Sequence, residues 1–258
     1  MRIIDVHNHI QMEDFDADRE AVLQRARDAG VGMIAVGVDG ATSAQAHRLA
    51  SIHGDVWATV GYHPHDADDF DATRDDIKKI AHEERVVGIG ECGLDYFKMD
   101  ETAMRTDAIR QKELFQWHVK LSHDVRKPLV IHCREAFADM FLVLENNRQY
   151  LLEEPGICHF FTGTMDDARR LLELNFSFTF GGLITFNQSF DDVIRYIPAS
   201  HILAETDAPF VSPLSHRGKR NEPAYILETV SALAGIKEMN GDALMQVMFE
   251  NAKRVFQL

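Results

Sequence analysis

The chain has few cysteines and no long apolar run, and both absences limit what it can be. Only 3 of its 258 residues are cysteine, an odd number that argues against a disulfide framework and favours a reducing compartment. No apolar segment approaches the ~20 residues needed to cross a bilayer. The N-terminal segment also lacks the pattern of a signal peptide, because acidic residues follow soon after His9. We therefore expect a cytoplasmic protein with no membrane contact.

Positive charge is scarce as well. The chain carries 27 Lys and Arg against 41 Asp and Glu, which gives a formal net charge of −14. Such a surface repels polyanions over long range. Binding to nucleic acid would therefore need a local exception, made by metal ions or by a basic loop.

The chain also lacks a Pro/Ser/Gly-rich linker and low-complexity segments, so we expect one domain spanning residues 1–258. Eight short runs rich in Val, Ile, Phe or Thr have the composition of β-strands. These runs are residues 2–7, 32–38, 56–63, 86–91, 128–132, 156–161, 176–182 and 201–207.

Segments with helical spacing separate most of these runs. Thr42 is a candidate helix cap, and Thr164 with Asp167 predicts a capping box. Strand and helix in alternation imply a parallel sheet covered by helices. Eight repeats of about 30 residues favour a closed (β/α)8 barrel over an open sheet. The pattern is least regular at the Gly181-Gly182 pair and in the short helical segment 189–197.

Metal-competent side chains recur at the ends of the predicted strands, where barrel enzymes carry their function. Any one of them is more often a hydrogen-bonded structural residue. Their recurrence at equivalent positions predicts a metal centre, with enough ligands for two cations if one carboxylate bridges them. The residues are His7, His9, Glu91, His132, His159 and Asp207. In an extended strand, Asp5 would share the face of His7 and His9.

A cysteine follows or precedes three of these residues, at Cys92, Cys133 and Cys158. A zinc site built from Cys and His is one interpretation. Strand alternation argues against it, because neighbours of inward-facing ligands point outward toward the helices. We therefore expect the cysteines to be small buried apolar residues.

Several sequence blocks in a fixed order carry a resemblance to a known family. They read DVHNH at 5–9, GYHPH at 61–65, GECGLDY at 90–96, PLVIHCREA at 128–136, HFFTG at 159–163, ETDAP at 205–209 and RGKRNEP at 217–223. Together they resemble the TatD family of metal-dependent hydrolases, within the amidohydrolase-like group of barrel enzymes. The chain departs from the family pattern at Val6, Gln11 and Phe160, where the family usually has a small residue, an acid and a cysteine. None of these departures replaces a metal ligand.

The resemblance implies two divalent metal ions with Glu91 as the bridge. One ion would be held by His7, His9, Glu91 and Asp207, and the other by Glu91, His132 and His159. Imidazole and carboxylate ligands suit Zn or Mn, whereas the family is usually activated by Mg, which prefers oxygen ligands. The identity of the ion stays open between Mg, Mn and Zn.

The expected reaction is hydrolysis of a phosphodiester by a metal-activated water, with Asp207 accepting its proton. The resemblance implies a deoxyribonuclease that acts on single-stranded DNA or 3′ ends. Candidate substrate contacts are His63, Arg134, and Arg217 with Arg220 in a basic run after the eighth strand. An alternative for Arg134 is that it pairs with Glu205.

Two other function classes are compatible with the sequence. The same activated water could hydrolyse an amide or ester, as in a deacylase, and an acidic protein suits such a less anionic substrate. A binding protein that keeps its metals for stability is the third class. The sequence gives no oligomeric state, and a monomer is compatible with it.

Overall fold

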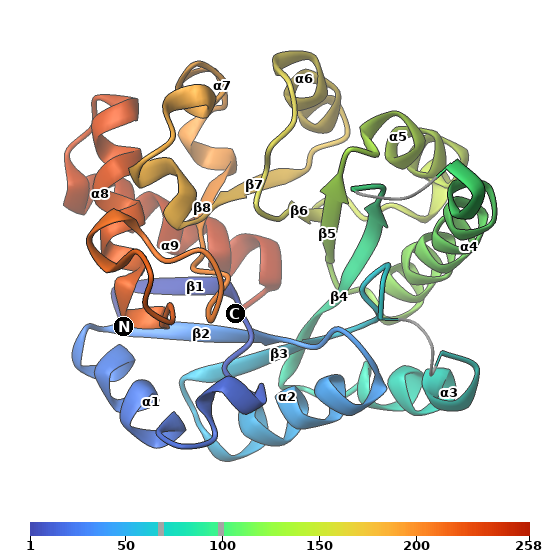
Figure 1. Ribbon diagram of the computed structural model, residues 1–258, viewed down its shortest axis with the longest axis horizontal. Coiled ribbons are helices and arrows are strands. Elements are labelled where there is room, and N and C mark those ends of the chain that lie inside the picture. Colours follow the sequence, from blue (N-terminus) through green and yellow to red (C-terminus); the bar gives the residue numbers. More distant parts are fainter. Residues whose placement is uncertain (67–69, 98–100) are drawn as a thin grey trace.

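The protein is an eight-stranded parallel β-barrel surrounded by helices (Figure 1), as predicted. The computed structural model describes residues 1–66, 70–97 and 101–258, and the side chains of residues 101–105 are left out of the description. The strands are β1 (Ile3–Asn8), β2 (Val31–Val36), β3 (Val56–Val60), β4 (Val86–Asp95), β5 (Leu129–Arg134), β6 (Gly156–Cys158), β7 (Ser177–Phe180) and β8 (Ile202–Ala204). Each overlaps one of the eight predicted runs, with ends that differ by up to a few residues.

The strands follow one another in sequence order from β1 to β8, and each neighbouring pair is parallel. The first and last strands meet through a small set of specific bonds. The backbone N–H of Asp207 donates to His7 O at 2.9 Å, and His9 N–H donates to Ala208 O at 2.8 Å. This junction, which we call the seam, brings the two ends of the barrel together.

The helices surround the barrel, and the last one also packs against its interior. They are α1 (Arg19–Asp28), α2 (Gly40–Ile52), α3 (Phe70–Ile80), α4 (Glu101–Val125), α5 (Phe137–Asn146), α6 (Met165–Glu173), α7 (Asp191–Tyr196), α8 (Ile226–Lys237) and α9 (Gly241–Phe256). Short 3-10 turns are η1 (Glu13–Phe15), η2 (Arg148–Tyr150), η3 (Gly182–Thr185), η4 (Gln188–Phe190), η5 (Ala199–His201), η6 (Leu214–His216) and η7 (Pro223–Tyr225).

Two cap predictions can be compared with the structure. The predicted capping box of Thr164 and Asp167 is present at the start of α6. Thr42 is not the cap of α2, because Asp39 holds that position and Thr42 lies one turn later as its reciprocal partner. An aspartate accepts backbone N–H groups at a helix start as well as a threonine does.

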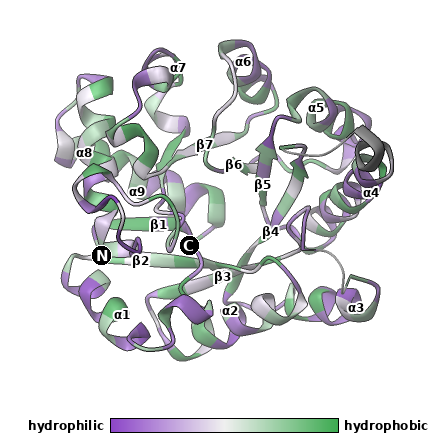
Figure 2. Ribbon diagram, viewed as in Figure 1, coloured by the Kyte–Doolittle hydropathy of each residue, from purple (hydrophilic) through white to green (hydrophobic). Residues whose placement is uncertain are grey.

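Apolar side chains form two layers, and the strands are correspondingly apolar in Figure 2. An inner cluster gathers one face of the strands, including Ile4, Ile34 and Val130, against Val255 and Phe256 of α9. A larger outer cluster fills the space between the strands and the surrounding helices. Successive residues of a strand belong to opposite layers, as alternation requires.

The three cysteines are free and buried, and all belong to the outer cluster. His132 therefore points inward while its neighbour Cys133 points outward, as the alternation argument predicted. Burial raises the pKa of each of these thiols, so they stay protonated and apolar. Within the described residues, no helix has the length and apolar character that a membrane span requires.

Strand β4 is longer than the predicted run, because it continues from Glu91 to Asp95. Gly93 makes this extension possible. Its φ is +135°, and a Cβ there would lie 2.0 Å from His132 O on the neighbouring strand. Only glycine fits such a close approach. The extension places Asp95 beside β5, at the same edge of the barrel as Glu91.

Replacement of Gly93 should therefore destabilise the folded protein. We expect Gly93→Ala to lower the free energy of unfolding by about 3 kcal/mol or more, because a strained backbone and a backbone clash add together. Gly54→Ala is the matched control, since a Cβ there meets nothing within 4 Å, and its effect should stay within about 0.5 kcal/mol. Urea unfolding of the metal-free variants measures both. Equal midpoints for Gly93→Ala and the unaltered protein would contradict the close approach described above.

Candidate metal centre

A buried glutamate lies between two pairs of histidines at the carboxyl-terminal edge of the barrel. Glu91 Oε2 lies 3.3 Å from His7 Nε2 and 3.8 Å from His9 Nε2. Its other oxygen, Oε1, lies 2.9 Å from His132 Nδ1 and 2.9 Å from His159 Nε2. Each oxygen therefore faces a different histidine pair, so one carboxylate can serve two ion positions.

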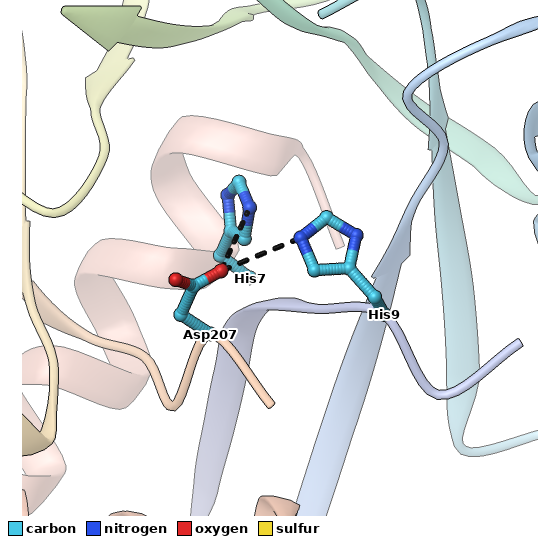
Figure 3. Close-up of side chains that lie close together, drawn as sticks. All are labelled: His7, His9 and Asp207. Carbon is cyan, nitrogen blue, oxygen red and sulfur yellow. Dashed lines mark ion pairs between the residues drawn. The ribbon is translucent and has the colours of Figure 1, made fainter. Parts of the chain in front are cut away.

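The first cluster assembles across the seam from the two ends of the chain (Figure 3). Asp207 Oδ1, which follows β8, lies 3.4 Å from His9 Nε2 and 3.7 Å from His7 Nε2 at the end of β1. His9 Nδ1 is bonded to Val36 O at 2.9 Å, which fixes the ring with Nε2 toward Asp207. These three side chains offer ligand atoms within 4.8 Å of one another.

Asp5 does not join this cluster, although strand alternation predicted that it would share the face of the histidines. Its carboxylate accepts from Thr206 N–H at 2.9 Å and from Thr206 Oγ1–H at 2.6 Å. The register of β1 changes between Asp5 and Asn8, so simple alternation fails there. Asp5 instead holds β1 to the segment that carries Asp207.

The second cluster consists of Glu91, His132 and His159, whose ligand atoms also lie within 4.8 Å of one another. It adjoins the first, because the rings of His7 and His159 stack with centroids 3.9 Å apart and planes at 10°. The structure thus brings together all six side chains that the sequence singled out for a metal centre. Which of them bind an ion is a proposal, developed below.

The second nitrogen of His132 is bonded to a carboxylate that sequence reasoning missed. His132 Nε2 lies 3.0 Å from Asp95 Oδ2, and Asp95 Oδ1 accepts from Phe97 N–H at 2.8 Å. Buried Gln111 of α4 bonds both the N–H and the C=O of Asp95, at 2.9 and 3.1 Å. This chain of contacts fixes the plane of the imidazole. Continuing the alternation of β4 from Glu91 through Gly93 would have identified Asp95.

His159 is backed by a second fully buried carboxylate. Glu205 Oε1 lies 3.6 Å from His159 Nδ1 and accepts from Phe160 N–H at 2.8 Å. Its Oε2 accepts from Thr179 Oγ1–H at 2.6 Å. Burial opposes protonation of His159, but the negative charges of Glu91 and Glu205 raise its pKa. The 3.6 Å separation is longer than a hydrogen bond, and His159 Nδ1 has no hydrogen-bond partner among the described residues.

The electrostatics of the two clusters fit divalent cations. Burial opposes ionisation of Glu91, but the fields of His159 and His7 and hydrogen bonds from His132 and His159 hold its pKa well below its usual value. Burial is the main cause that lowers the pKa of His7. Burial opposes protonation of His9, His132 and His159, but the neighbouring carboxylates raise the pKa of all three. Because metal binds the ionised carboxylate and the neutral imidazole, a bound ion would displace protons from these rings. Both ring nitrogens of His7 are buried without a hydrogen-bond partner among the described residues. Of the two, Nε2 faces Glu91 and Asp207, so this atom could bind a metal ion.

The predicted substrate residues His63 and Arg134 lie at this edge of the barrel. His63 Nε2 is 3.9 Å from Glu91 Oε1, and its ring centroid is 4.5 Å from that of His132. Arg134 is exposed, and its guanidinium carbon lies 3.4 Å from the centroid of the Phe97 ring. It therefore does not supply the bonds that hold Glu205, which come from Thr179 and Phe160. Arg134 lines a cavity of about 300 Å³ together with His132, His159 and Asp207.

The two arginines of the basic run differ. Arg220 donates to both oxygens of Asp18 at 2.8 Å and lies over the Phe15 ring. That bidentate pair links the segment after β8 to the start of α1, and the substrate contact expected of Arg220 stays a prediction. Arg217 is exposed, with its guanidinium 4.5 Å from the Phe186 ring. The sequence could not separate them, because Asp18 is 202 residues away in the chain.

A larger cavity, of about 420 Å³, lies between α3 and α4. Its lining includes Phe70, Arg74 and Trp117, and none of its lining residues belongs to either cluster. The smaller cavity beside Asp207 is therefore the one that the candidate chemistry can use.

Comparison with known proteins gives matches over nearly the whole chain. The family model described as TatD related DNase matches residues 4–257. The chain is 36% identical to an uncharacterised metal-dependent hydrolase, YabD, of Bacillus subtilis, with 99% of each chain covered. It is 32% identical to a protein of Pantoea ananatis named 3′-5′ ssDNA/RNA exonuclease TatD, over 99% of this chain and 100% of that one.

Among solved structures, a TatD homologue of Escherichia coli, YjjV, superimposes with a TM-score of 0.91 at 28% identity. The superposition covers 100% of this chain and 98% of that one. A match of nearly full length in sequence and in structure leads to one conclusion: the chain belongs to the TatD family of metal-dependent hydrolases.

Proposed function

We propose that this hydrolase is a phosphodiesterase that acts on DNA, as a deoxyribonuclease of the 3′-5′ exonuclease type. The observation that carries the proposal is the placement of Glu91, whose two oxygens face separate histidine pairs. This arrangement suits two cations that share one bridge, a common design for phosphodiester hydrolysis. The relatives named 3′-5′ ssDNA/RNA exonucleases, at 32–33% identity, support nucleic acid as the substrate.

The proposed ligands divide between the two clusters. One ion would be held by His7, His9, Glu91 and Asp207, and the other by Glu91, His132 and His159. When bound, the cations would supply an activated water and neutralise the charge that develops on the phosphoryl group. The donor set of imidazole and carboxylate accepts Mn or Zn readily and Mg less so.

The protein's own side chains have separate tasks in this proposal. Burial opposes ionisation of Asp207, but the hydrogen bond from His9 and the fields of His7 and His9 lower its pKa, so it is an anion at neutral pH. Its carboxylate would accept the proton of the attacking water. The exposed guanidinium of Arg134 would bind a phosphate oxygen at the mouth of the cavity, and His63 would contact the substrate beside Glu91.

The net charge of −14 does not exclude this substrate. A single-stranded end at the barrel mouth brings few phosphates close to the protein, unlike a long duplex footprint. Arg134 and Arg217 are exposed cations available for them. An amide or ester hydrolase remains the second candidate, because the same site would also activate water toward a carbonyl and the acidic surface favours a less anionic substrate.

Loss of the Asp207 carboxylate should remove activity without removing the fold. Asp207 has a φ of +56°, a conformation that asparagine also adopts readily. We expect Asp207→Asn to lower kcat on labelled single-stranded DNA with Mn²⁺ by about 100-fold or more, the range of a lost general base. Circular dichroism and thermal unfolding serve as the folding control. Turnover equal to that of the unaltered enzyme would show that Asp207 has no such role.

Asp95 should control metal affinity through His132. We expect Asp95→Asn to weaken binding of Mn²⁺ about 10–100-fold, as loss of a carboxylate behind a ligating histidine usually does. Competition with a fluorescent chelator measures this without turnover. The matched control is Asp139→Asn, since Asp139 bonds Tyr96 and Lys112 outside both clusters. An unchanged Mn²⁺ affinity in Asp95→Asn would show that Asp95 does not support His132 as a metal ligand.

Substitution of Arg134 distinguishes the two candidate substrate classes, DNA and a neutral ester. Arg134→Gln should raise KM for single-stranded DNA about tenfold at low salt, because a charged hydrogen bond to phosphate is lost, and should leave hydrolysis of a neutral p-nitrophenyl ester unchanged. Arg169→Gln, at an exposed arginine paired with Asp166, is the control. Rapid ester turnover with no cleavage of 3′-labelled DNA, unaffected by Arg134→Gln, would favour the amide or ester hydrolase.

A further inference from the structure

One side of the cavity beside the metal centre is apolar. His132, His159 and Asp207 line the polar side, and Phe160, Leu183 and Val211 lie among the other lining residues. We call Phe160, Leu183 and Val211 the apolar wall. The ring centroid of Phe160 is 6.3 Å from that of His159, so the apolar wall lies directly beside a proposed ligand. Neither metal binding nor water activation needs such a surface.

Two residues of the wall have unusual backbone conformations. Phe160 has a φ of +44° and Val211 a φ of +43°. Non-glycine residues rarely adopt positive φ, and for a β-branched residue such as valine it is a strong outlier. Strained residues of this kind concentrate at functional sites, where surrounding structure holds them. The N–H of Phe160 is held by Glu205 Oε1 at 2.8 Å and by Thr179 Oγ1 at 3.1 Å.

The Gly181-Gly182 pair after β7 has no side chains, which leaves space for Phe160 and Val211. A Cβ on Gly181 would lie 2.9 Å from Cε2 of the Phe160 ring, and a Cβ on Gly182 would lie 2.5 Å from Val211 O. Both distances are shorter than ordinary contacts, so any side chain here would displace the wall. The irregular glycine pair in the sequence thus has a definite role, which is to seat Phe160 and Val211 beside the clusters.

We propose that Phe160, with Val211 and Leu183, forms a subsite for the nucleobase of the nucleotide whose phosphate lies at the metal centre. The inference rests on the proposed phosphodiesterase function. A nucleotide has an anionic phosphate and a flat apolar base, and this cavity has an exposed arginine, Arg134, and an apolar wall. Bases stack on aromatic rings with little dependence on their identity. Phe160 is therefore a substrate-binding residue that favours nucleotides over phosphodiesters without a base.

The test compares two single-stranded oligonucleotides that differ only in the nucleotide at the 3′ end. This nucleotide is thymidine in one and an abasic tetrahydrofuran residue in the other. We expect the unaltered enzyme to have the lower KM for the thymidine end. Phe160→Leu should raise that KM about tenfold, the effect of losing one stacked base, and leave the KM for the abasic end unchanged. Gly181→Ala should act in the same direction, because it displaces the ring and leaves Phe160 in place.

Two further measurements distinguish binding from damage to the fold. Phe249→Leu, at a half-buried phenylalanine of α9 that does not line the cavity, should change neither KM. Calorimetry with Mn²⁺ present should show that Phe160→Leu weakens binding of thymidine 5′-monophosphate and spares deoxyribose 5-phosphate. Equal KM values for the two ends, or an equal effect of Phe160→Leu on both, would overturn the subsite alone. Failure of the unaltered enzyme to cleave either oligonucleotide would overturn the phosphodiesterase function as well.

Discussion

The site depends on closure of the barrel at the seam between its first and last strands. Asp5, fully buried on β1, accepts two hydrogen bonds from Thr206, 201 residues later in the chain. Burial raises its pKa to about 8 even though those bonds favour the charged form. The same junction carries the bond from Asp207 N–H to His7 O. Because His7 and His9 lie on one side of the seam and Asp207 on the other, the first cluster exists only when the barrel is closed.

The second constraint is charge. Among the described residues, no lysine or arginine lies within ion-pair distance of Glu91, whose ion-pair partners are all histidines. A buried carboxylate that is not neutralised by a cationic side chain is expensive in free energy. Burial opposes protonation of His9, His132 and His159, but nearby carboxylates raise the pKa of these rings, so their charged forms supply part of that neutralisation. Divalent cations would complete the balance, which is why this set of side chains suits metal better than a purely structural network.

Much of the architecture follows from local sequence. The eight apolar runs and the helical segments between them predicted the barrel, because strand and helix periodicities differ and a parallel sheet needs helical crossovers. The six candidate ligands could be named for the same reason, since parallel strands all end at one edge. Alternation also placed Cys133 correctly, on the face opposite His132. Each of these inferences uses only neighbouring residues and the geometry of one strand.

The tertiary structure decided what depends on contacts between distant segments. It assigned Arg220 to Asp18 and left Arg134 and Arg217 exposed, although all three look alike in the sequence. It showed that Asp5 holds the seam, that Asp95 supports His132, and that the Gly181-Gly182 pair makes room for Phe160. The sequence by itself determined the barrel and the identity of its candidate ligands, because strand period and strand ends are local properties. Only folding decided each side chain's partner, because a hydrogen bond or close contact forms wherever the closed barrel brings two atoms together.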